Sequence, residues 1–476
     1  MTTPLDPAAT AALQRAAALS IDFRNQLDDG PQRPRADYHE MLQRFDAPLP
    51  GTGASPAAVI AQLADRAAPG LTAMTGRRFF GWVIGGSHPV GVAADWLTSA
   101  WGQNAGNHLA SPAAAACETV AARWLLELLG LPPEASVGFT TGATMANFVG
   151  LAAARGEVLR RVGWDADARG LFGAPPIQVL IGDDAHTTVF SALQYLGLGH
   201  ERVTRVATGA DGAIDAAAFE QALLHCPEGP LIVVLQAGQI NTGAFDPFLP
   251  LIARARARGA WVHVDGAFGL WARACPAHAA PAEGVQAADS WATDGHKWLQ
   301  TPYDCGYAIV RDAQAHERAM SVHASYLPDS AGDRNPASLV PELSRRARGF
   351  ATWALISHLG RDGIAAMVER HGRLARRIAD RIARERGAAL LNEVVLNQAV
   401  LRFGADVGTE AGDRLTRAVI DRVQREGRCF VGGAQWRGRW VMRLSVIGAT
   451  EEADADLAAE AIAAAWRAER DAALED

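Results

Sequence analysis

The sequence predicts an α/β fold in which a mostly parallel central sheet is covered by helices on both faces. From about residue 136, short β-rich runs alternate with helical segments, and this alternation is typical of parallel strands joined by crossover helices. The chain has 476 residues, of which 49% are hydrophobic and 20% charged, and this composition excludes disordered, coiled-coil and collagen-like proteins. A chain of this length can bury a large core without metals or disulfides.

A helical arm is expected before the sheet. Residues 7–27 carry apolar side chains at helical spacing, and a Pro- and Gly-rich stretch at 47–56 separates them from the rest of the chain. Such an arm usually packs onto the main body or onto a partner subunit, and we assign residues 1–70 to it. Residues 90–130 are predicted to be largely helical.

The central region supplies the sheet. Strands are predicted at residues 177–181, 203–207, 231–235, 261–264, 290–293 and 307–310, with helices at 144–155, 186–196, 215–224 and 247–258. In an open parallel sheet, ligands bind beyond the carboxyl ends of the strands. We therefore expect residues 71–350 to form one α/β domain with its site at that edge.

The last part of the chain, residues 351–476, is predicted to form a separate, smaller α+β domain. A helical stretch runs from about Phe350 to about Arg386, strands are expected near 393–403, 428–431 and 439–446, and a final helix runs from 452 to about 470.

Composition also excludes several kinds of partner. The net charge is −7, and the 45 basic and 52 acidic residues are spread along the chain, which indicates neither nucleic-acid binding nor polybasic membrane binding. The five cysteines lack CxxC or zinc-finger spacing, so we expect no structural metal site and reduced thiols. No signal-peptide pattern and no apolar run of about 18 residues is present. These features predict a soluble, cytoplasmic protein.

One basic residue differs from all the others. Of the 45 basic residues, 44 are arginines, and Lys297 is the single lysine. An arginine-favouring codon bias explains the arginines but not the lysine that remains, because drift could have replaced it too. A lysine amine can lose its proton when desolvated and attack a carbonyl, whereas a guanidinium stays protonated. Lys297 is therefore predicted to be catalytic.

Two motifs suit a flat ligand that carries a phosphate. Residues 140–144 (TTGAT) lead into a helix, where small side chains and free N–H groups favour an anion. An ordinary capped helix start is the alternative. His186 comes after the strand predicted at 177–181 and can stack its ring on a flat cofactor, although a lone histidine is usually structural.

Two further motifs lie at strand ends. Asp265 ends the run WVHVD, where a buried carboxylate needs a partner such as a protonated pyridine nitrogen, or else caps a helix. Lys297 lies in DGHKW, where a desolvated amine can form a Schiff base; a surface lysine is the alternative. Together, the four motifs match what pyridoxal phosphate needs from a protein.

With these motifs, the chain resembles a known family, the group II pyridoxal-phosphate-dependent decarboxylases, which include aromatic amino acid, histidine and glutamate decarboxylases. The resemblance extends from about residue 75 to 450 and is carried by the segments SPAAAACETVAARWLLELLGLP, TTGATMANFVGLAAAR, DDAHTTVFSALQYLGLG, NTGAFDPF, WVHVDGAFGLWA and ADSWATDGHKWLQTPYDCGYA. It implies a fold-type-I homodimer with active sites at the subunit interface and pyridoxal phosphate as cofactor.

The resemblance also implies roles for individual residues. Lys297 would form the aldimine with the cofactor, Asp265 would pair with its pyridine nitrogen, and His186 would stack on its ring. The other positions implied near the cofactor are Ala267 on the opposite ring face, Ala143 and Thr144 in the phosphate loop, Thr242 beside the phenolic oxygen, and His296 before the lysine.

Two departures from the family pattern affect the expected chemistry. Asp294 stands where many animal decarboxylases have an asparagine that helps to bind the phosphate; other branches share the aspartate. Residues 327–343 contain no tyrosine, although aromatic decarboxylases carry a loop tyrosine there that protonates the quinonoid carbon. Tyr326, His323 or His296 could substitute for it. Loss of that acid in relatives is associated with aldehyde products.

The leading hypothesis is decarboxylation of an L-amino acid to its amine and carbon dioxide. Another carbon–carbon lyase or a decarboxylating aldehyde synthase is the alternative; an aminotransferase is favoured less, and retention of the single lysine argues against a pseudoenzyme. Trp82 and Val83 are expected to line the substrate pocket, with His108 contributed by the partner subunit. These aromatic and apolar walls slightly favour an aromatic substrate over an aliphatic one.

Overall fold

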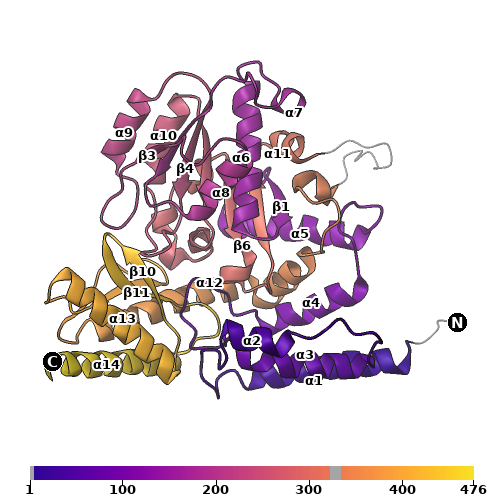
Figure 1. Ribbon diagram of the computed structural model, residues 1–476. Helices are drawn as coiled ribbons and strands as arrows, with labels where there is room; N and C mark the ends of the chain where they lie inside the picture. The colour runs from indigo at the N-terminus through magenta and orange to yellow at the C-terminus, as the bar shows by residue number, and fades with distance from the viewer. Residues whose placement is uncertain (1–4, 322–333, 476) are drawn as a thin grey trace.

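A computed structural model describes residues 5–321 and 334–475. Along the chain, an N-terminal group of helices is followed by a large sheet with helices around it and then by a second, smaller sheet with its own helices (Figure 1). No helix in the described ranges is both long and apolar enough to cross a membrane.

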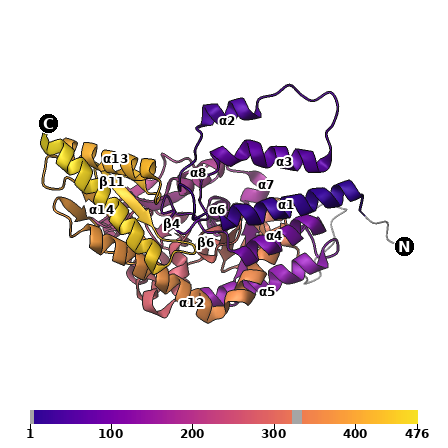
Figure 2. The same ribbon diagram turned by 90° about the horizontal axis from the view of Figure 1, so that it is seen from below.

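The N-terminal arm consists of three helices, α1 (Pro7–Asn25), α2 (Tyr38–Phe45) and α3 (Pro56–Ala67). They lie together at one side of the molecule (Figure 2). Helix α2 begins with a capping box, in which Asp37 and Glu40 each accept the other's backbone N–H. No residue of these three helices is buried within the chain. Helices α4 (Pro89–Trp101) and α5 (Pro112–Leu129) come next, so the predicted helical character of residues 90–130 is confirmed.

The large sheet has seven strands in the order β1-β7-β6-β5-β4-β2-β3. They are β1 (Ser136–Thr140), β2 (Gln178–Gly182), β3 (Thr204–Val206), β4 (Leu231–Gln236), β5 (Trp261–Asp265), β6 (Ser290–Asp294) and β7 (Gly306–Val310). All neighbours pair in parallel except β7, which runs antiparallel to both β1 and β6. The mostly parallel sheet is confirmed, and β1 is an additional strand.

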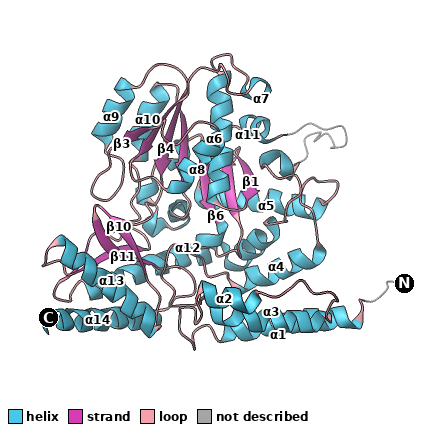
Figure 3. Cartoon of the chain, in the orientation of Figure 1, coloured by secondary structure: helices cyan, strands magenta, loops and turns pink. Residues whose placement is uncertain are grey.

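Helices cover both faces of this sheet, and β4 shows why its sequence is apolar throughout (Figure 3). Ile232 and Val234 pack in a core with α6 (Ala143–Arg160) and α8 (Thr187–Tyr195). The alternate residues Val233 and Leu235 pack on the other face with α9 (Ala216–His225) and α10 (Phe248–Ala257). Because successive side chains point to opposite faces, a strand covered on both faces must be apolar at every position. The short α7 (Ala166–Arg169) and α11 (Ala313–Met320) complete this region.

The C-terminal part contains a four-stranded antiparallel sheet in the order β10-β11-β9-β8. Its strands are β8 (Ala388–Leu390), β9 (Gln398–Phe403), β10 (Gly432–Trp436) and β11 (Arg439–Ser445), and its helices are α12 (Gly349–Ile382), α13 (Thr409–Glu426) and α14 (Glu452–Glu475). The long helix α12 is interrupted at Gly360, whose φ of +62° is unfavourable for other residues.

The prediction of a strand at 428–431 is wrong, because the strand β10 lies at Gly432–Trp436 instead. Arg437 and Gly438 both have positive φ, at +51° and +73°, and they connect Trp436 to Arg439 as a two-residue hairpin. This turn fixes the register, so that the pairing begins at the turn rather than at the apolar run. Phe430 forms an isolated bridge with Phe79.

Candidate active site

The predicted site residues meet at the carboxyl edge of the large sheet. Strands β5 and β6 end at Asp265 and Asp294, and the segments after β1 and β2 bring Thr141 and His186 to the same edge. Together they line a cavity of about 330 Å³. Eight of the predicted residues are in its wall: Ala143, Thr144, His186, Asp265, Ala267, Asp294, His296 and Lys297. These residues come from widely separated segments because the ends of parallel strands converge in space.

Lys297 is held by an ion pair. It lies in the short π-helical turn η6 (Gly295–Leu299) directly after β6, and its side chain is only 17% exposed. Its Nζ lies 2.9 Å from Oδ2 of Asp294, whose side chain is 2% exposed. The surface-lysine alternative is therefore wrong, because the ammonium faces a buried carboxylate inside the cavity.

The second oxygen of Asp294 caps the helix that was predicted to bind phosphate. The backbone N–H of Ala143, at the start of α6, donates to Asp294 Oδ1 at 2.6 Å. The N-cap residue is Gly142, which supplies no side-chain cap. A Cβ at Gly142 would lie 2.9 Å from Cε1 of His296, so only glycine fits at this position. The helix start is therefore capped from across the cavity rather than by a neighbouring residue.

Asp265 is a buried carboxylate in the cavity wall. Its side chain accepts the N–H of Ala267 at 3.2 Å, as the helix-cap alternative anticipated for a turn at this point. Burial raises the pKa of Asp265, whereas the neighbouring His186 and Lys297 act to lower it. A carboxylate in such surroundings gains from a cationic partner in the cavity.

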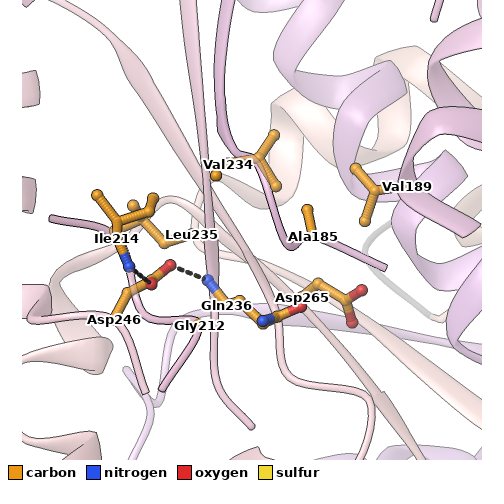
Figure 4. A pocket seen from close by; sticks show the side chains of 10 residues that line it. Ala185, Val189, Gly212, Ile214, Val234, Leu235, Gln236, Asp246 and Asp265 are labelled. Carbon is orange, nitrogen blue, oxygen red and sulfur yellow. Dashed lines mark hydrogen bonds between the residues drawn. The ribbon is translucent and has the colours of Figure 1, made fainter. Parts of the chain in front are cut away.

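Hydrogen bonds made by Asp246 hold the strand ends next to Asp265 in place. Asp246 accepts the backbone N–H groups of Ile214 and Gln236, each at 2.7 Å, and Gln236 lies between Asp246 and Asp265 (Figure 4). A void of about 10 Å³ separates these side chains. Burial raises the pKa of Asp246 to about 7. Because Gln236 pairs in register with Asp265, Asp246 helps to fix the strand end that carries the site carboxylate.

His186 presents a neutral imidazole to the cavity. Its Nδ1 accepts the backbone N–H of Thr188 at 3.3 Å and lies 2.8 Å from the hydroxyl of the same residue. This leaves the ring proton on Nε2. Burial lowers the pKa of His186; the charge of Asp265 opposes this shift, while the charges of Lys297 and Arg443 add to it. A neutral, fixed ring of this kind suits stacking on a flat group.

His296 and Tyr303 form a stacked pair in the same wall. Their ring centroids are 4.3 Å apart with an interplanar angle of 29°. His296 Nδ1 accepts the N–H of Cys305 at 3.2 Å, and its Nε2 lies 3.5 Å from Asp294 Oδ1. Burial lowers the pKa of His296. Sequence reasoning missed Tyr303, although its place in the loop that follows Lys297 was a signal for it.

Arg443 is a second residue that sequence reasoning missed. It lies on β11 in the small sheet, and its Nε and Nη2 are buried without a hydrogen-bond partner in the described part of the chain. Burial lowers the pKa of Arg443 to about 10. The charge of Arg443 also acts to lower the pKa of His186, a residue of the cavity wall. An arginine inside the apolar run VMRLSV was the signal in the sequence.

Four predicted residues lie elsewhere in the single chain. Thr242 donates its hydroxyl to the carbonyl of Asp211 at 2.5 Å and is not in the cavity wall. Val83 is packed in the main core, Trp82 is 54% exposed, and His108 Nδ1 lies 2.9 Å from Asn335 Oδ1. Their roles stay predictions. Tyr326 and His323 lie outside the described residues.

The donor set of the cavity fits one cofactor class. No group of three or more His, Cys, Asp or Glu side chains in the described ranges is arranged to hold a metal ion. Instead, the wall offers an amine, a helix N-terminus, a buried carboxylate and a neutral imidazole, which suit the aldehyde, phosphate, pyridine nitrogen and ring of pyridoxal phosphate. Fold and site therefore define a pyridoxal-phosphate-dependent enzyme of fold type I.

Comparison with known proteins places the chain within this class. The sequence profile of the pyridoxal-dependent decarboxylase conserved domain matches residues 39–403, and the chain belongs to this family. It is 25% identical to an aromatic-L-amino-acid decarboxylase of Bacillus atrophaeus, over 91% of this chain and 90% of that protein. It is 30% identical to an L-2,4-diaminobutyrate decarboxylase of Rhizobium meliloti, over 78% and 73%.

A solved structure confirms the fold. The crystal structure of Oryza sativa TDC with PLP and tryptamine superposes with a TM-score of 0.91 over 98% of this chain and 99% of that one, at 24% identity. The protein is thus a pyridoxal-phosphate-dependent amino acid decarboxylase, a carboxy-lyase.

Proposed function

We propose that this decarboxylase acts on an aromatic L-amino acid and releases the matching amine and carbon dioxide. When bound, pyridoxal phosphate supplies an electron sink for the bond that breaks. Lys297 would hold its carbonyl carbon covalently, and Asp265 would keep its pyridine nitrogen protonated. His186 would cover one ring face and Ala267 the other, while Ala143, Thr144, Asp294 and His296 would surround the phosphate and Thr242 would lie near the phenolic oxygen.

A cluster of aromatic side chains next to the loop of Lys297 supports the proposal of an aromatic substrate. Phe79, Trp82 and Phe430 stack on one another, with centroid distances of 4.7 Å for Phe79–Phe430 and 5.6 Å for Trp82–Phe430. The same segment continues to Gly85, whose N–H donates to the carbonyl of His296 at 3.2 Å. An aromatic side chain placed against such a cluster gains both apolar burial and ring contacts.

Arg443 is proposed to bind the substrate carboxylate. Its buried guanidinium nitrogens without partners in the described chain are costly unless an anion pairs with them. An α-carboxylate held there would be fixed relative to the ring covered by His186. By holding the breaking bond in a fixed orientation, the protein would increase the rate.

The N-terminal arm supports a homodimer. Its helices carry large apolar side chains on exposed surface, among them Leu13, Ile21, Phe23, Leu42, Phe45, Val59 and Leu63. A second copy covering them is the proposed occupant, and it would bring His108 of one subunit near the site of the other. We expect light scattering to give twice the mass of one chain.

We further propose that the chain is divided into an arm (1–70), a cofactor domain (71–350) and a small domain (351–476).

We also propose that the protein is cytoplasmic. All five of its cysteines are free, as is usual for proteins in that reducing compartment.

A panel of L-amino acids tests the function. The cofactor-loaded protein is incubated with each amino acid while carbon dioxide and product mass are followed together. We expect equal amounts of carbon dioxide and amine from an aromatic substrate. Release from aliphatic amino acids alone would refute the aromatic assignment. Aldehyde with hydrogen peroxide would favour a decarboxylating aldehyde synthase, the second candidate, which the absence of tyrosine from residues 327–343 supports. No carbon dioxide from any amino acid would favour another carbon–carbon lyase.

A further inference from the structure

The reaction needs a proton donor beside the carbon that loses carbon dioxide. When the bond to the carboxylate breaks, its electron pair stays with the rest of the substrate, and an amine forms only if a proton reaches that carbon. Without the proton, dioxygen can take the electron pair instead. The substrate then gives aldehyde, ammonia, carbon dioxide and hydrogen peroxide, with one water consumed. The position of an acid in the cavity therefore decides between the two products.

Most proton-bearing groups in the wall are unsuited to this step. Lys297 is paired with Asp294 at 2.9 Å. Burial lowers the pKa of both His186 and His296, and a neutral imidazole is a very weak acid. The remaining N–H of His296 lies toward Asp294 because its Nδ1 accepts the Cys305 N–H.

Tyr303 is in a different situation. It lines the cavity with Lys297 and Asp265, and its ring lies against His296 at a centroid distance of 4.3 Å. Partial burial and the negative charge of Asp294 raise the pKa of Tyr303 to about 12, so the phenol keeps its proton at neutral pH.

The loop fixes Tyr303 in this place. The next residue, Asp304, accepts two hydrogen bonds from Nε of Arg348, at 2.9 Å to its carboxylate and 3.1 Å to its carbonyl. Arg348 is the N-cap of the long helix α12. Stacking on one side and this anchor on the other limit the movement of the phenol.

We propose that Tyr303 is the catalytic acid of the reaction. Its hydroxyl gives a proton to the substrate α-carbon after carbon dioxide leaves, and the phenolate then takes a proton from solvent at the half-exposed ring. The balance is one amino acid and one proton in, and one protonated amine and one carbon dioxide out. This proposal rests on the amine-forming function proposed above.

The test compares Tyr303→Phe with Tyr195→Phe, a matched control on α8 whose ring is 66% exposed and lies outside the cavity wall. Amine, aldehyde, hydrogen peroxide and carbon dioxide are measured for both, and pyridoxal phosphate binding to the apo-proteins is titrated by absorbance. For Tyr303→Phe we expect amine formation to fall at least about 100-fold, which is the usual contribution of a positioned acid. Residual turnover should give aldehyde and peroxide in equal amounts, while cofactor affinity is unchanged. Tyr303→His puts an imidazole at this half-exposed position, where it can be protonated below about pH 6.5, and it should recover part of the amine at such a pH.

Three results would overturn the assignment. Amine formation by Tyr303→Phe at the wild-type rate would exclude Tyr303 as the acid while leaving the amine-forming function intact. Loss of cofactor binding in the same variant, with no change in the product ratio and no recovery in Tyr303→His, would show a structural role. Aldehyde as the main product of the wild-type protein would refute the amine-forming function itself and Tyr303 with it.

Discussion

Lys297 and Asp294 form an ion pair of 2.9 Å inside the cavity, and the same carboxylate accepts the first N–H of helix α6 from Ala143. One side chain therefore pairs with the amine that we propose to bind the cofactor and also occupies the helix start that we propose for its phosphate. A cofactor that brings both an aldehyde and a phosphate would meet Asp294 at both of these points.

Asp294→Asn is expected to tighten binding of pyridoxal phosphate by about tenfold, or about 1.4 kcal/mol. The substitution removes a negative charge beside the site proposed for the phosphate and leaves only a neutral acceptor for the N–H of Ala143. Titration of the apo-protein measures the effect, with pyridoxal, which lacks the phosphate, as the control ligand. Weaker binding of pyridoxal phosphate, with pyridoxal unchanged, would mean that the carboxylate supports the phosphate instead.

Reduction with borohydride should attach the cofactor to Lys297 alone among the side chains, because the chain has no other lysine. Peptide mass spectrometry of the reduced protein identifies the labelled residue. Lys297→Arg keeps the positive charge beside Asp294 but forms no Schiff base, so it should carry no label and release carbon dioxide only at the background rate. A labelled Lys297→Arg variant would contradict the assignment.

Arg443→Gln is expected to raise KM by about tenfold to 100-fold, because a buried charge-assisted hydrogen bond to the carboxylate contributes about 1.5–3 kcal/mol. The KM of Arg443→Lys should lie between those of the wild type and Arg443→Gln, because lysine keeps the charge but cannot form two parallel hydrogen bonds to a carboxylate. Arg439→Gln, on the exposed start of the same strand β11, is the matched control. Steady-state kinetics with the preferred amino acid measure the KM of each variant. An unchanged KM in Arg443→Gln would exclude binding of the substrate carboxylate by Arg443.

His371 should make stability fall at low pH. Its Nε2 lies 2.7 Å from the carbonyl of Gly448, and burial lowers the pKa of the imidazole from 6.5 to about 3. Between these pH values the unfolded chain binds a proton at this residue that the folded chain does not, so the free energy of unfolding decreases as pH falls. The contribution is about 1.4 kcal/mol per pH unit.

Urea unfolding of the apo-protein between pH 6.5 and 4 measures this slope. His371→Gln should be less stable overall but should show a pH slope shallower by about 1.4 kcal/mol per unit than the wild type. His200→Gln, at an exposed side chain, controls for the substitution itself. Equal slopes in the wild type and His371→Gln would show that His371 titrates alike in both states.

The sequence by itself predicted most of the strands and helices and eight residues that line the cavity. Lys297, Asp265 and His186 were found because each lies at or just after a strand end, and the carboxyl ends of parallel strands converge at one edge. Periodicity and strand-end position are local properties, so they can be taken from a single segment of sequence. The uniqueness of the lysine is also visible without a structure.

Only the tertiary structure decided which distant groups touch. The Ala143–Asp294 hydrogen bond joins residues 151 positions apart, and the charge of Arg443, on a different sheet, acts on His186. Tyr303 acquired a role only when its ring was placed against His296. Strand β10 moved from the predicted apolar run to the residues next to its turn because the hairpin fixed the register. Such contacts depend on how side chains of separate elements pack and pair in three dimensions, which no local pattern in the sequence encodes.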